Sequence, residues 1–101
     1  MQKDQFLTQL LTAYQTANLV QYRQSEVLYC RAVSLKAIAK AIVPVMSLKD
    51  FKVNVLAVKK DINATIPSYT LEFGYARDQK LALKIGNEKL SSLTVYNYEI
   101  R

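Results

Sequence analysis

The apolar residues near the start of the chain recur at spacings of three and four, which is the period of an α-helix. Asp4 lies near the beginning of this pattern, where a carboxylate suits the positive end of the helix dipole. The pattern predicts a helix over residues 3–22. Its apolar stripe consists of Phe6, Leu7, Leu10, Leu11, Tyr14 and Ala17.

A second helical pattern covers residues 25–43. Ser25 can cap this helix, and Pro44 ends it because proline has no N–H group to donate. Residues 26–34 are also compatible with a strand, in which case Ser34 would cap a shorter helix. One unbroken helix is the first prediction, and the alternative is a chain that begins as helix, strand, helix.

The period changes to two after residue 50, which is typical of strands with one buried face. Turn-like residues at 76–79 and 86–89 and a longer loop at 61–67 separate the runs. Short links predict an antiparallel meander, with the two helices packed on one face. The expected fold is a two-layer, single-domain α+β protein. Its four strands are predicted at about residues 51–59, 68–76, 80–86 and 92–100.

The absence of histidine excludes most catalytic arrangements. Ser-His-Asp and Cys-His sites cannot form, and neither can zinc sites built on imidazole. The eight acidic residues are scattered singly, and the sequence has no glycine-rich phosphate loop. The sequence therefore predicts a non-enzymatic protein that needs no cofactor and no metal.

Hydropathy along the chain gives an expectation about its surroundings. No apolar run reaches the roughly 18 residues of a membrane span, and the first residues lack the apolar region of a signal peptide. We therefore expect a cytoplasmic protein without a membrane partner. Cys30, the single cysteine, is expected to be a small buried apolar side chain.

The first predicted helix has an unusual polar face, because no charged residue occurs between Gln5 and Tyr22. A face exposed to water usually carries Lys and Glu, whereas amides and hydroxyls can be buried at lower desolvation cost. This face predicts a contact with a protein partner or a second copy of the chain. A solvated face, or one covered by the rest of the chain, is the alternative. The candidate partner-binding residues are Gln5, Thr8, Gln9, Thr12, Gln15 and Thr16.

The net charge of +6 arises entirely between Arg23 and Lys60. A positive patch there would attract nucleic acid or an acidic protein, so nucleic-acid binding is the alternative function. Exposed tyrosines such as Tyr29, Tyr69, Tyr75, Tyr96 and Tyr98 could stack on bases, but no helix-turn-helix or other nucleic-acid-binding signature is identified. Ordinary solubility charge is the competing interpretation. The basic candidates are Arg23, Arg31, Lys36, Lys40, Lys49, Lys52, Lys59 and Lys60.

Overall fold

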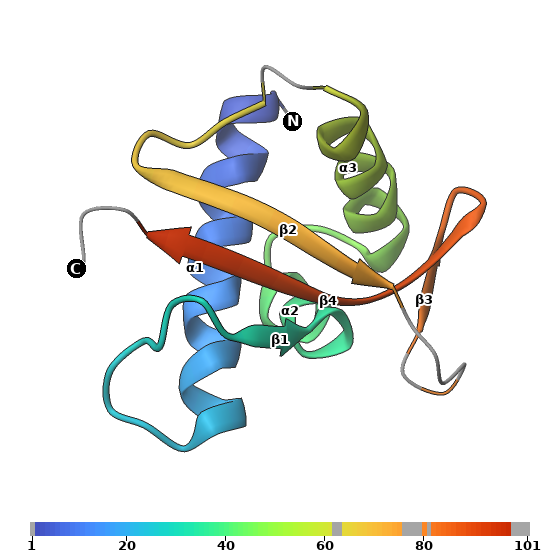
Figure 1. Ribbon diagram of the computed structural model, residues 1–101. Coiled ribbons are helices and arrows are strands. Elements are labelled where there is room, and N and C mark those ends of the chain that lie inside the picture. Colours follow the sequence, from blue (N-terminus) through green and yellow to red (C-terminus); the bar gives the residue numbers. More distant parts are fainter. Residues whose placement is uncertain (1, 62–63, 76–79, 81, 98–101) are drawn as a thin grey trace.

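The computed structural model describes residues 2–61, 64–75, 80 and 82–97 (Figure 1). These residues form a compact α+β domain with three helices and a four-stranded antiparallel sheet. The helices are α1 (Lys3–Tyr22), α2 (Leu35–Ile42) and α3 (Leu48–Lys60), and the strands are β1 (Ala32–Ser34), β2 (Tyr69–Tyr75), β3 (Leu83–Ile85) and β4 (Glu88–Asn97). The α+β class is confirmed, whereas the predicted count of two helices is wrong.

The first helix agrees with its prediction. Phe6, Leu10 and Tyr14 are fully buried, as their spacing on one helical face requires. The helix ends at Arg23, whose φ of 52° is left-handed. This conformation ends the helical hydrogen-bond pattern.

The predicted unbroken helix over residues 25–43 is wrong. The helix–strand–helix order of the alternative is found, but the strand covers only Ala32–Ser34 of the predicted 26–34. Strand β1 precedes α2 directly, and the Ser34 hydroxyl caps α2 by accepting from the backbone N–H of Ala37 at 3.5 Å. Val33 is fully buried and pairs with Leu93 of β4. Sheet pairing therefore overrides the helical pattern over this stretch.

Polar side chains of α1 fasten the segment that leads into β1. The Asn18 amide donates to Leu28 O at 2.9 Å and accepts from Leu28 N at 3.0 Å. One turn further on, the Gln21 amide donates to Ala32 O at 3.0 Å and accepts from Ser34 N at 2.9 Å. Part of the uncharged surface of α1 is therefore occupied by this chain's own backbone.

The strand predicted over residues 51–59 is also wrong, because this segment belongs to α3. Phe51, Val55 and Val58 are buried at spacings of four and three, whereas Val53 is 61% exposed. The Ser47 hydroxyl caps the helix by accepting from the N–H of Asp50 at 3.1 Å. The segment has apolar residues at every second position, as a strand would, but it forms a helix that buries only one of its faces.

The sheet is not a meander, because its central strand is the last one. Strand β4 lies between β1 and β2, and its first residues pair with β3. The strands predicted at 68–76, 80–86 and 92–100 overlap β2, β3 and β4. Residues 76, 81 and 98–100 of these predictions, and the turn at 76–79, lie outside the described residues. The turn predicted at 86–89 is shorter than expected and is made by Gly86 and Asn87.

Helices and strands contribute to one cluster of buried residues. Figure 1 shows α1 crossing behind β2 and β4, with α3 beside the β3–β4 hairpin. One face of α3 is therefore fixed in the core while the other remains accessible. Fully buried members of the cluster include Phe6, Ile38, Phe51, Val55, Ile85 and Leu93.

Candidate nucleic-acid interface

Helices α2 and α3 are joined by a short turn at residues 43–47, which backbone hydrogen bonds stabilise. The N–H groups of Val45 and Met46 both donate to Ile42 O, at 2.8 and 3.1 Å. Met46 points into the core, and Ser47 caps the next helix. A helix, a short turn and a second helix are also the local arrangement that helix-turn-helix motifs use. The start of α3 has a signal in the sequence, because Ser47 and Asp50 have the spacing of a capping box.

The outer face of α3 combines lysines with exposed apolar side chains. Lys49, Lys52, Val53, Leu56 and Lys60 recur at spacings of three and four, so they form a single stripe. Leu48, at the start of the helix, is 44% exposed, and Val53 is 61% exposed. The stripe lies opposite the buried face that holds α3 in the core.

A shallow groove of about 400 Å³ runs between this stripe and the β3–β4 hairpin. We call it the α3–hairpin groove, and its described lining residues include three lysines and no acid. Gly86 lies at the hairpin turn with φ +62°, and a Cβ there would come within 3.1 Å of the Leu56 side chain. The groove is lined by Leu48, Lys49, Lys52, Val53, Leu56, Lys84 and Gly86.

The hairpin adds a like-charge pair beside this groove. Lys84 of β3 lies directly opposite Lys89 of β4, and both are exposed. Facing residues on antiparallel strands have neighbouring side chains, and like charges at such positions destabilise the pair. An anion bound between the two lysines would remove that repulsion.

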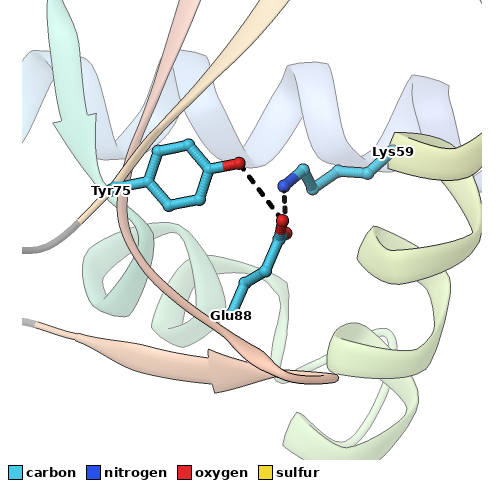
Figure 2. Close-up of polar contacts among 3 residues, drawn as sticks. All are labelled: Lys59, Tyr75 and Glu88. Atoms are coloured by element: carbon cyan, nitrogen blue, oxygen red, sulfur yellow. Dashed lines mark hydrogen bonds and ion pairs between the residues drawn. The ribbon is translucent and has the colours of Figure 1, made fainter.

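Lys59 is neutralised within the chain. Its Nζ forms an ion pair with Glu88, whose Oε1 also accepts from the Tyr75 hydroxyl at 3.2 Å (Figure 2). Hydrogen bonding from Lys59 is the main cause that lowers the pKa of Glu88. Desolvation by burial lowers the pKa of Lys59, but the hydrogen bond and the negative charge of Glu88 outweigh it, so the pKa of Lys59 is raised overall. Lys59 is therefore a weaker candidate for an external anion than its neighbours.

The other predicted basic residues do not form one continuous patch with the lysines of α3. Lys36 and Lys40 are exposed on α2, where the Lys36 ammonium donates to Lys80 O. Arg23 and Arg31 flank the segment that connects α1 to β1, which Figure 1 shows at the end of α1 far from α3. The basic segment of the sequence is thus divided among separate surfaces.

The predicted partner-binding residues of α1 lie on its outer side with many of their hydrogen bonds already made. Thr8, Thr12 and Thr16 are exposed, and each hydroxyl donates to the carbonyl four residues earlier. Gln15, half-buried, donates to the Tyr29 hydroxyl at 3.0 Å. Gln9 is also half-buried, whereas Gln5 is exposed and accepts weakly from the Gln2 N–H at 3.4 Å.

The tyrosines do not form an open stacking surface among the described residues. Tyr29 packs between Tyr14 and Tyr69, with ring centroids 6.4 and 5.8 Å away. The hydroxyls of Tyr75 and Tyr96 donate to Glu88 and Glu72, and Tyr98 lies outside the described residues. This arrangement gives little support to single-strand binding by base stacking.

Cys30 differs from its prediction, because it is exposed rather than buried. Its φ of 64° places it in a tight bend just before β1, and its N–H donates to Val95 O at 2.9 Å. Backbone geometry rather than side-chain packing therefore defines this position.

Within the described ranges, no cluster of three or more His, Cys, Asp or Glu side chains is arranged to hold a metal ion. None of the helices in that part of the chain is long and apolar enough to span a membrane.

Comparison with protein-family models, curated proteins and solved structures gives no match.

Proposed function

We propose that this protein binds double-stranded DNA, with α3 in the major groove and the β3–β4 hairpin on the adjacent phosphates. The major groove is about 12 Å wide and admits an α-helix. A helix of 13 residues such as α3 is about 20 Å long, enough to follow the groove over several base pairs. In helix-turn-helix proteins the second helix of the unit enters this groove.

The observation that carries the proposal is the Lys84–Lys89 pair beside the lysines of α3. A free protein gains nothing from two facing lysines, whereas a phosphate between them would satisfy both. Lys49, Lys52 and Lys60 on the outer face of α3 would extend the same positive surface along the backbone of the duplex.

The order of the elements also supports this function. In winged helix-turn-helix domains a helix and a short strand precede the helix pair, and strands follow it. Here α1 and β1 precede α2 and α3, and β2 and the β3–β4 hairpin follow them, with β2 as an additional strand paired to β4. The proposal rests on the charge and exposure of the residues named above.

The test measures binding to a fluorescein-labelled 20-base-pair duplex by anisotropy between 50 and 200 mM salt. We expect log K to fall linearly with log salt, by about 0.9 for each phosphate contacted. Lys84→Glu should weaken binding roughly tenfold and reduce this slope by about one. Thermal stability at low salt should be maintained or raised, because the introduced carboxylate would face Lys89 with the opposite charge.

Arg23→Asp is the matched control, since it reverses a positive charge in the same way but lies far from α3. Aspartate, like asparagine, can adopt the left-handed conformation of position 23. We expect this variant to bind the duplex like the unmodified protein. Equal weakening by both substitutions would indicate a general charge effect, and binding that is absent or independent of salt would contradict DNA binding.

The uncharged face of α1 is a second candidate surface, and we propose it for a protein partner or a second copy. The exposed threonines of α1 recur every fourth residue, at Thr8, Thr12 and Thr16. Val20 continues this row and is 75% exposed. Val20 also borders a shallow groove between α1 and α2, whose lining includes Ala17, Ala37 and Ala41 together with Lys36 and Lys40. The threonines and Val20 of α1 carry no charge, so the α1 side of this surface can be desolvated at low cost.

Light scattering at low and high salt tests this second surface. Self-association through α1 predicts a dimer that persists at high salt and that Thr12→Lys converts to a monomer. Lys84→Glu should leave this dimer intact. A monomer at both salts would exclude self-association through this face at the concentrations used.

A further inference from the structure

The outer face of α3 offers few hydrogen-bonding side chains other than lysine for reading base edges. The helix contains no Arg or Gln, and its single amide, Asn54, donates to Asp50 O at 2.8 Å. The α3 residues that line the α3–hairpin groove are Lys49, Lys52 and the apolar residues Leu48, Val53 and Leu56. Lysines can donate to phosphates or to guanine O6 and N7, whereas the apolar side chains can contact only apolar groups of the bases.

Val53 is the apolar residue best placed for such a contact. It is 61% exposed near the middle of α3, with Lys49 and Lys52 on the same stripe. Its buried neighbours on the opposite side, Phe51 and Val55, fix the helix beneath it. An exposed valine between lysines gains free energy only when a partner covers it.

The major groove offers one apolar group at its base edges, the C5 methyl of thymine. We infer that Val53 contacts thymine methyl groups and that sites containing thymine opposite the middle of α3 are therefore preferred. This inference rests on the proposed DNA binding. It assigns sequence preference to an apolar contact, while the lysines provide affinity that does not depend on sequence.

Duplexes in which uracil replaces thymine test this assignment. Uracil pairs with adenine in the same way but lacks the methyl group. The probes are a 20-base-pair alternating A·T duplex and the matching A·U deoxyribonucleotide duplex, measured by anisotropy at one salt concentration. Covering one methyl group corresponds to about a fourfold gain in affinity, so the A·T duplex should bind about fourfold more tightly.

Val53→Ala should lower this preference toward equality without changing the salt slope, because the phosphate contacts remain. Val43→Ala is the matched control. It also shortens an exposed valine, but in the turn between α2 and α3, and it should retain the preference.

The outcomes separate this inference from the proposal on which it rests. Equal binding of both duplexes by the unmodified protein, with a steep salt slope, would overturn the thymine contact and leave DNA binding in place. A preference that Val53→Ala does not change would also overturn the role of Val53. Absence of binding to either duplex would overturn both proposals.

Discussion

Phe51→Ala is expected to destabilise the protein by about 4 kcal/mol, the usual cost of removing a fully buried phenylalanine from a core. Phe51 has no exposed surface, and its ring lies 6.3 Å from that of Phe6, centroid to centroid. The substitution would leave a cavity and remove a contact between α3 and α1. Urea unfolding monitored by circular dichroism measures the loss of unfolding free energy.

Two further variants keep this prediction testable if Phe51→Ala fails to fold. Phe51→Leu retains much of the volume and should cost roughly 1–2 kcal/mol. Val53→Ala removes two methyl groups from the same helix at an exposed position and should change stability by less than about 0.5 kcal/mol. Similar losses at positions 51 and 53 would contradict the orientation of α3.

Asn18→Leu is expected to cost about 3 kcal/mol, because it leaves both backbone groups of Leu28 without their partner. Asn18 is the one fully buried polar residue among the described positions. Its amide makes the two backbone hydrogen bonds with Leu28 that a neighbouring strand would otherwise provide. Chemical unfolding measures the cost, and amide hydrogen exchange should show faster exchange at Leu28.

Gln21→Leu is the matched comparison, since the Gln21 amide makes the same kind of two-bond contact with Ala32 and Ser34. Gln21 is exposed, so water can replace its bonds, and the expected cost is about 1 kcal/mol or less. Equal costs at positions 18 and 21 would show that burial of the contact is unimportant.

The sequence was sufficient to predict elements whose apolar period was unambiguous. Helix α1 and strands β2 and β4 were located because each had a period that only one structure satisfies. Residues 51–59 did not meet this condition. Apolar residues at positions 51, 53, 55 and 57 fit a strand, while burial at 51, 55 and 58 fits a helix. The cap at Ser47 distinguishes the two.

The candidate interface was predicted only in part, for a different reason. Charge counting along the chain located Lys49, Lys52 and Lys60, but it grouped them with Arg23 and Arg31. It also omitted Lys84 and Lys89, which lie outside the basic segment and reach the site through the pairing of β3 with β4. Neutralisation of Lys59 by Glu88 likewise depends on contacts between distant residues.

The central position of β4 has a consequence for the kinetics of folding. Strand β1 pairs with residues 92–94, although it lies at residues 32–34, and β2 pairs with the same strand. The helices can begin to form from local contacts, whereas closing such long loops is slow. Until β4 docks, the edges of β1 and β2 have no pairing partner, and they can associate with other unfolded chains. We therefore expect the docking of β4 to determine whether refolding leads to the native protein or to aggregates.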